Sequence, residues 1–121
     1  MNGYEINCAK RLVQQHIADN YIEGLTQSLA AGLEVLQVGG SAFDASIKAV
    51  MIMEDNPLFN AGKGAVYTKD EAHELEAAVM NGANLETGAA CGLAHVKNPI
   101  LLAKAVMEKS PYVYMYGKGA E

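Results

Sequence analysis

The residues of this sequence best suited to chemistry lie in a loop, residues 55–64, which contains Pro57, Gly62 and Gly64. A proline and closely spaced glycines turn backbone carbonyl groups in unusual directions. Carbonyl oxygens turned in this way can bind a hard cation. The same pattern is typical of an ordinary connector between a helix and a strand, so the loop by itself leaves both interpretations open.

The other polar residues do not form a complete active site. Three histidines lack the spacing of metal ligands: His16, His73 and His95. The Gly62–Lys63–Gly64 tripeptide lacks the four-residue gap that precedes the Gly-Lys pair of a phosphate-binding loop. Nucleophilic catalysis needs a hydroxyl or thiol beside a base, and Thr26, Thr68 and Thr87 have no free N-terminal amine for that role. We therefore expect no catalytic residue in this chain.

Composition narrows the class of protein. Of 121 residues, half are hydrophobic, 9 are basic and 14 are acidic, and the basic residues are scattered. This balance is typical of a globular domain and offers no footprint for a nucleic acid. No apolar run reaches the ~18 residues that cross a bilayer, and the first residues lack the pattern of an export signal. We expect a cytoplasmic chain with no nucleic-acid or membrane partner.

Two helices should position the loop. Ile22 and four leucines recur at spacings of three and four and predict an amphipathic helix that ends at Gly39–Gly40: Leu25, Leu29, Leu33 and Leu36. Residues 12–17 could extend this helix backwards, or Asn20 and Glu23 could cap a new one, and the sequence does not decide between them. The second helix should begin at Ser41, whose spacing from Asp44 is like a capping box, and end at Asn56–Pro57.

Short strands and a third helix should follow the loop. The β-type segments are residues 65–68, 74–80 and 88–96, and residues 81–84 are typical of a hairpin turn. Asn98 as cap and Pro99 at the first position predict a helix over residues 100–109, with Lys104 and Glu108 paired on its exposed side. Residues 112–116 alternate like another strand. Helices segregated from an antiparallel hairpin indicate an α+β layered fold.

The loop and its flanks resemble a known family. Residues 56–68, Asn-Pro-Leu-Phe-Asn-Ala-Gly-Lys-Gly-Ala-Val-Tyr-Thr, resemble the signature of plant-type L-asparaginases and isoaspartyl (β-aspartyl) peptidases, which are N-terminal-nucleophile threonine hydrolases. Further segments resemble the same family: residues 40–46, 73–82, 88–92, 97–100, 106–111 and 117–121. The resemblance covers about nine-tenths of the chain, from Leu12 onward. Residues 1–7 do not match the strand with which the family opens, and Glu76 and Asn81 stand where the family more often has aspartate.

The resemblance implies a four-layer αββα sandwich made as a precursor that cleaves itself before a threonine. In the family that threonine starts a second chain, and its hydroxyl, with its own α-amine as base, attacks the side-chain amide of asparagine or an isoaspartyl bond. An acyl-enzyme forms through an oxyanion and is then hydrolysed. By this resemblance, residues 1–121 are a single partial domain that corresponds to the α-portion, without the first strand and the threonine-bearing β-portion.

The resemblance also implies a structural sodium ion, with no cofactor required. Its ligands would be the main-chain carbonyl oxygens of six residues: Met53, Glu54, Asn56, Phe59, Ala61 and Lys63. The ion would stiffen the loop so that Asn60 supports the neighbourhood of the nucleophile.

Two functional hypotheses follow. In the first, the chain is the α-portion of an amidohydrolase for L-asparagine or isoaspartyl dipeptides, active only with a threonine-bearing β chain, in a dimer of such α–β units. In the alternative, it is an inactive truncated or split remnant that serves as a folding or binding partner. Both predict unpaired strand edges and an apolar sheet face that another chain would cover.

Overall fold

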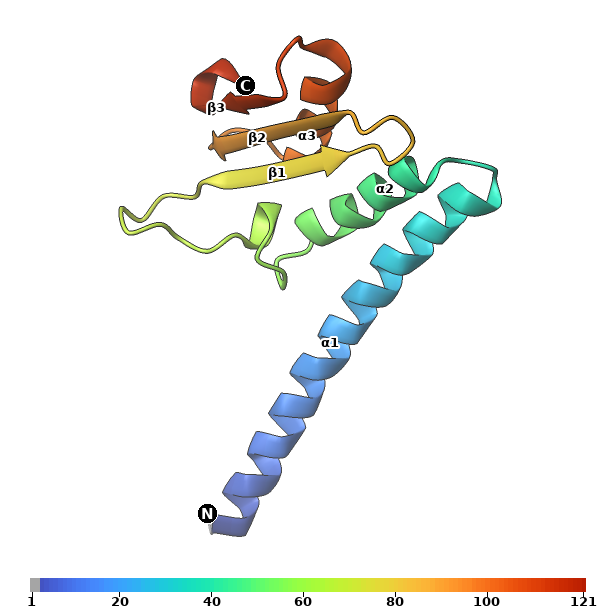
Figure 1. Ribbon diagram of the computed structural model, residues 1–121. Helices are drawn as coiled ribbons and strands as arrows, with labels where there is room; N and C mark the ends of the chain where they lie inside the picture. The colour runs from blue at the N-terminus through green and yellow to red at the C-terminus, as the bar shows by residue number, and fades with distance from the viewer. Residues whose placement is uncertain (1–2) are drawn as a thin grey trace.

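The computed structural model describes residues 3–121, with side chains from residue 10 onward. Figure 1 shows a long helix α1 (Gly3–Gln37), helix α2 (Ala42–Glu54) and a small sheet with helix α3 (Pro99–Lys109) behind it. The sheet contains β1 (Leu75–Met80), β2 (Thr87–Leu93) and β3 (Tyr114–Tyr116). Two 3₁₀ turns, η1 (Gly62–Gly64) and η2 (Gly117–Gly119), complete the described elements. The fold is α+β, as predicted.

Helix α1 is continuous through residues 12–23, so the first leucine-bearing segment extends backwards and no new helix begins at Asn20. Its contact with α2 uses small residues four positions apart: Gly24, Ser28 and Gly32. The Ser28 hydroxyl donates to the carbonyl of Ala49 at 2.8 Å. Although α1 has 35 residues, it lacks the sustained apolar stretch needed to cross a membrane, as do the other described helices.

The predicted leucine face of α1 is exposed. Leu29 is 73% and Leu33 is 49% exposed, and Leu25 and Leu36 lie between these values. At 100° per residue, this stripe lies about a quarter-turn from the small residues that contact α2. Periodicity therefore identified the helix but not the face that packs.

Helix α2 begins as predicted. The Ser41 hydroxyl oxygen accepts a hydrogen bond from the Asp44 backbone N–H at 3.0 Å, while its own proton goes to the Asp44 carboxylate at 2.7 Å. The side chain of Asp44 is also 2.7 Å from the Lys104 ammonium of α3. A residue that caps α2 thus also joins α2 to α3.

Helix α3 begins at Pro99 as predicted, but the prediction that Asn98 caps it was wrong. The Asn98 side chain makes no cap bond and instead donates to Asp55 at 3.3 Å. The Ile100 N–H, one of the unpaired donors of the first turn, donates to the Glu54 carboxylate at 2.9 Å. The predicted pair of Lys104 and Glu108 is present at 3.7 Å.

The sheet has the order β1-β2-β3. Strands β1 and β2 form the predicted antiparallel hairpin, and β3 runs parallel to β2. The prediction of a strand over residues 65–68 was wrong, because donors in this segment bond locally. The Val66 N–H donates to the Asn60 side chain at 3.0 Å and the Thr68 N–H to the Ala72 carbonyl at 2.7 Å.

The core lies between α3 and one face of the sheet. Its buried members are Ala90, Leu93, Val106 and Ala120. Small residues of β2 let α3 approach closely. A side chain at Gly88 would meet the Ala103 carbonyl and would lie 2.5 Å from the Met107 backbone nitrogen. Packing of α3 on β2 therefore requires glycine at this position.

Replacing Gly88 by alanine is expected to lower the free energy of unfolding by about 1 to 2 kcal/mol, because overpacking outweighs the reduced freedom of the unfolded chain. Urea unfolding followed by circular dichroism measures this change. Gly82→Ala is the matched control, since no atom lies within 4 Å of a Cβ built there. Equal stability of the two variants would contradict the proposed close approach.

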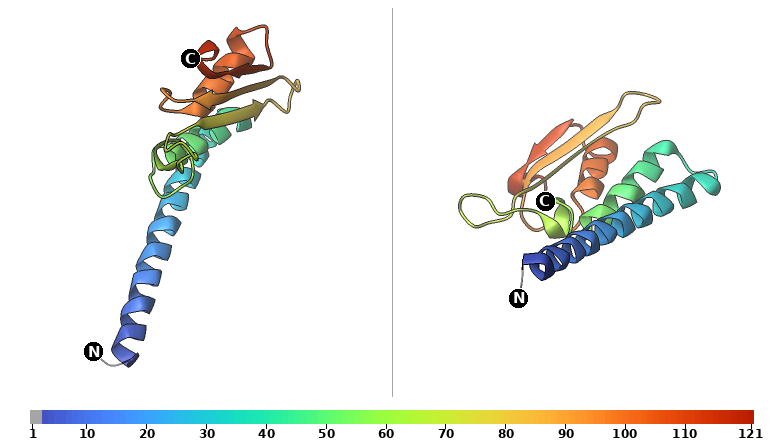
Figure 2. Two further views of the ribbon diagram at one scale, coloured as in Figure 1. Left: turned by 90° about the vertical axis from the view of Figure 1, so that its left-hand side faces the viewer. Right: turned by 90° about the horizontal axis from the view of Figure 1, so that it is seen from below.

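The helical layer is wider than the sheet. Helix α1 packs on α2, α2 contacts α3, and α3 packs on β1 and β2. Figures 1 and 2 show α2 lying past the edge of β1 that faces away from β2. Half of the helical layer therefore has no strand over it within the described chain.

Candidate functional site

The predicted cation loop follows the last turn of α2 and is held by short backbone hydrogen bonds. The carbonyls of Met53, Asn56, Phe59 and Ala61 each accept one bond from an N–H two or three residues further on, at 2.8 to 3.3 Å. A carbonyl oxygen has two lone pairs. Four of the six predicted ligand oxygens therefore keep one lone pair free of these bonds.

The carbonyl of Glu54 lacks the usual helical partners. Pro57, three residues on, has no N–H. The N–H of Leu58, four residues on, donates to the Asn56 side chain at 3.0 Å. Proline and asparagine in the signature therefore direct the Glu54 carbonyl away from the helical pattern.

Several carbonyl oxygens gather around two glycines, and we call this arrangement the carbonyl cradle: the oxygens of Glu54, Pro57 and Phe59 around Gly62 and Gly64. A Cβ at Gly62 would lie 2.5 Å from the Glu54 oxygen, and Gly62 has a φ of +48°. A Cβ at Gly64 would meet the Phe59 oxygen and lie 2.7 Å from the Pro57 oxygen. Only glycine leaves these oxygens unobstructed.

Asn60 lies at the exposed tip of the loop. Its side-chain oxygen accepts the Val66 N–H at 3.0 Å, which closes the loop onto the segment that follows η1. Phe59 points the other way, onto α1, where its ring meets that of Tyr21 edge-on at 5.6 Å and covers Gly24. The loop is thus fixed against α1 on one side while Asn60 remains at the surface.

The side chain of Glu54 is a functional candidate that sequence analysis missed. Glu54 is 3% exposed, and its Oε2 has no hydrogen-bond partner among the described residues. Burial raises the pKa of this carboxyl, while the hydrogen bonds from Ile100 and Asn98 oppose the rise. A signal was present, since Glu54 continues the buried face of α2 seven residues after Ile47.

A second carboxylate joins the loop to α3 from outside. The Lys97 ammonium lies 3.1 Å from the Asp55 carboxylate, and this hydrogen bond is the main cause of a lowered Asp55 pKa. Both groups are substantially exposed, so the pair adds little to stability. Its effect is to orient the start of the loop beside the segment that leads into α3.

Glu121 fixes the far end of β2. Its carboxylate accepts the N–H groups of Ala94 and His95 at 2.7 and 2.9 Å and lies 3.1 Å from the His95 ring nitrogen Nδ1. The hydrogen bond from the His95 N–H, followed by that from Ala94, lowers the pKa of Glu121 to about 2. The ionised carboxylate therefore stabilises the folded chain.

This pKa shift predicts a pH dependence. The contribution of Glu121 should be complete above its ordinary pKa of 4.5 and should be lost as the pH falls toward about 2. Thermal unfolding of the natural chain and of Glu121→Gln, compared between pH 7 and pH 3, measures it. The difference in Tm should shrink at the lower pH, and a constant difference would contradict the role of the charge.

The three sequence-predicted elements of the site are therefore partly brought together. The six carbonyl residues occupy one compact turn between α2 and η1, and Asn60 lies at its tip. Among the described residues, no three His, Cys, Asp or Glu side chains cluster as metal ligands. Main-chain oxygens are thus the ligand type that this turn offers a cation.

Comparison with known proteins identifies the class to which this fold and loop belong. A family model described as Asparaginase matches residues 2–121, so the chain belongs to this family of hydrolases. It is 48% identical over 116 residues to an isoaspartyl peptidase of Escherichia coli (strain K12), covering 96% of this chain and 36% of that protein. A plant-type L-asparaginase of Pyrococcus furiosus is 48% identical over 99 residues, which are 82% of this chain and 32% of that protein.

A third relative, an isoaspartyl peptidase/L-asparaginase of Rattus norvegicus, is 41% identical over 99 residues, or 82% of this chain and 30% of that protein. The resemblance found in the sequence is thereby confirmed. The chain spans about a third of the length of the curated relatives that it matches.

Proposed function

We propose that this chain is the α-portion of a threonine-dependent amidohydrolase that acts on L-asparagine or isoaspartyl dipeptides. The observation that carries the proposal is the 48% identity to an isoaspartyl peptidase over 96% of the chain. Since the match spans 36% of that protein, the chain would work together with a threonine-bearing β-portion. Residues 1–121 would then be a partial domain, of which residues 1 and 2 lie outside the described part.

The described fold is compatible with part of a four-layer αββα sandwich. The helices α1, α2 and α3 would supply one helical layer, and the strands would supply part of one sheet. The open face of this sheet carries exposed side chains, among them Met80, Tyr114 and Tyr116. A second sheet would bury this face, and a dimer of α–β units would complete the assembly.

In this proposal the chain contributes a rigid loop and not the nucleophile. Main-chain oxygens of Met53, Glu54, Asn56, Phe59, Ala61 and Lys63 would hold a sodium ion, which would draw these dipoles together. The free lone pairs of four carbonyls and the carbonyl cradle support such a site. The loop held in this way would fix Asn60 beside the reacting threonine of the other portion.

The competing hypothesis is a remnant without activity that only binds a partner, and the short span of the chain relative to its relatives supports it. The test is to purify the chain alone and after co-expression with the unmatched remainder of the Escherichia coli isoaspartyl peptidase. Ammonia release from L-asparagine and aspartate release from an isoaspartyl dipeptide are then measured. We expect hydrolysis only in the mixture. Turnover by the pure chain would contradict the proposal, and silence in both samples would favour the remnant.

A further inference from the structure

The described sheet stops short of the helices beneath it. Helix α3 packs on β1 and β2, whereas α2 lies past the free edge of β1 (Figures 1 and 2). Domains bury the apolar face of each helix against a second layer. Helix α2 therefore has an apolar side on which a layer is expected.

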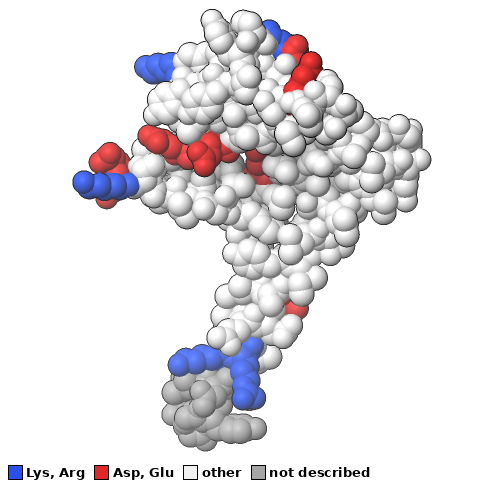
Figure 3. Space-filling view, viewed as in Figure 1, with Lys and Arg blue, Asp and Glu red and all other residues white. Residues whose placement is uncertain are grey.

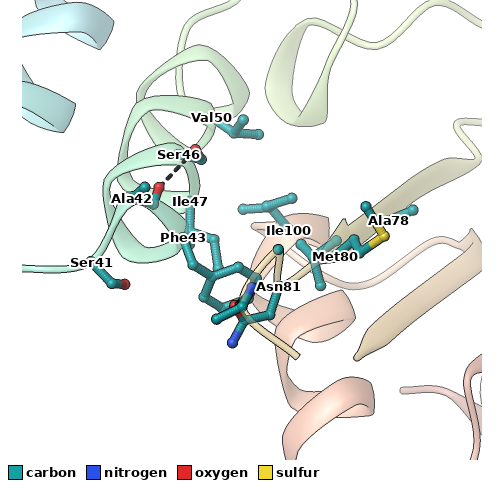
Figure 4. A pocket seen from close by; sticks show the side chains of 13 residues that line it. Ser41, Ala42, Phe43, Ser46, Ile47, Val50, Ala78, Met80, Asn81 and Ile100 are labelled. Atoms are coloured by element: carbon teal, nitrogen blue, oxygen red, sulfur yellow. Dashed lines mark hydrogen bonds between the residues drawn. The ribbon is translucent and has the colours of Figure 1, made fainter. Parts of the chain in front are cut away.

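A groove marks the place. It has a volume of about 660 Å³ and lies between α2 and the hairpin end of β1. Its apolar lining comes from three elements: Phe43, Ile47 and Val50 of α2, Met80 of β1 and Ile100 of α3. Figure 4 shows these side chains converging on one space. Figure 3 shows no Lys, Arg, Asp or Glu atoms over α2 and the hairpin tip on this face, so the groove suits an apolar occupant.

The free edge of β1 has backbone groups to offer that occupant. The Asn81 N–H donates across the hairpin to the Glu86 carbonyl at 2.8 Å. Since donor direction alternates along a strand, the N–H groups of Ala77 and Val79 also face β2. Those of Glu76, Ala78 and Met80 therefore point away from the sheet, where no described strand pairs with them.

The opposite edge of the sheet is a poorer site. Strand β3 has three residues and runs directly into the turn η2, whereas β1 has six. Six residues of strand extend for about 20 Å. The β1 edge is thus long enough for regular pairing, and only this edge adjoins the apolar groove.

We infer that a β-strand from the β-portion adds to the free edge of β1 and lies over α2. Its backbone would pair with the outward groups of Glu76, Ala78 and Met80, and its apolar side chains, on alternate positions, would fill the groove. The part of the Escherichia coli relative that this chain does not span, 64% by the difference of 100 and 36, is ample to supply it. The inference rests on the proposed function, because it takes the β-portion as the occupant.

Amide hydrogen exchange tests this edge. The probe is the unmatched remainder of the Escherichia coli isoaspartyl peptidase, mixed with the full chain. We expect exchange at Ala78 and Met80 to slow by about tenfold or more in the mixture, while Ala77 and Val79 are already protected in the free chain. Two chains that do not associate, or that associate without slowing exchange at Ala78 and Met80, overturn the inference.

Variants separate the backbone contact from misfolding. Ala78→Pro removes the outward N–H and should weaken association by about tenfold, the equivalent of one hydrogen bond. Ala78→Val keeps the N–H and should stay within about threefold of the natural chain. Circular dichroism identifies a variant that fails to fold, and exchange in the unaltered chain then decides alone. Equal association of two folded variants would overturn the inference.

Two outcomes distinguish this inference from the proposed function. Slowed exchange without hydrolysis would contradict the proposed activity and leave the strand addition intact. Hydrolysis without slowed exchange would support the activity and overturn the strand addition. Slowed exchange in the isolated chain that depends on its concentration would identify a second copy as the occupant and would also overturn it.

Discussion

Gly62→Val should lower the free energy of unfolding by about 3 to 5 kcal/mol, with comparable contributions from a strained left-handed backbone and from overpacking. The φ of +48° at Gly62 is costly for a β-branched residue. Its Cβ would also lie 2.5 Å from the Glu54 oxygen and 2.9 Å from the Glu54 Cβ. Neither neighbour can move cheaply, since both belong to the buried end of α2.

The measurement is thermal unfolding in sodium chloride and in choline chloride at equal ionic strength. If the proposed ion binds the loop, sodium should raise the Tm of the natural chain, and Gly62→Val should lose both stability and this increase. Lys63→Ala is the control, because it removes an exposed side chain and keeps the main-chain oxygen. An unaltered Tm of Gly62→Val in sodium buffer would be evidence against the role of the loop.

The second large effect is expected at Glu54. Glu54→Ala should cost about 3 kcal/mol, because it leaves the Ile100 N–H without a partner in a buried position and opens a cavity at the end of α2. Ile100 is 6% exposed, so water does not readily replace the carboxylate. Urea unfolding monitored by circular dichroism gives the difference.

Two further variants define the cause of this loss. Glu54→Gln keeps an acceptor for Ile100 and removes the charge that burial disfavours, so it should remain within about 1 kcal/mol of the natural chain. Glu34→Ala removes an exposed glutamate from α1 and should change little. If Gln proves as damaging as Ala, the negative charge and not the hydrogen bond stabilises the fold.

Local signals predicted most of the elements. Ser41 with Asp44, the Asn81–Gly82 turn and Pro99 each act on neighbouring residues, so their helix starts and hairpin follow from the sequence. The failures involve side chains that bond across the chain. Asn98 has the right type for a cap but is drawn to Asp55, 43 residues earlier. The donors of residues 65–68 go to local partners such as Asn60, which composition does not reveal.

The candidate site was predictable to the same extent. Proline and the glycines mark the loop, and the resemblance supplied its six carbonyl residues, whose role as ligands stays a prediction. The position of the Glu54 side chain depends on how α2 meets α3, which periodicity along one helix does not contain. For the same reason the leucine stripe of α1 gave no indication that Gly24, Ser28 and Gly32 form the packed face.

The bond between Glu54 and Ile100 spans 46 residues, and it bears on the order in which the chain acquires structure. Helix α3 has no local cap, so its first turn is completed only when α2 arrives. Isolated helices as short as its 11 residues are marginal in water. We therefore expect α3 to gain lasting helicity late, after closure of a long loop, whereas the longer α1 can begin to coil without distant help.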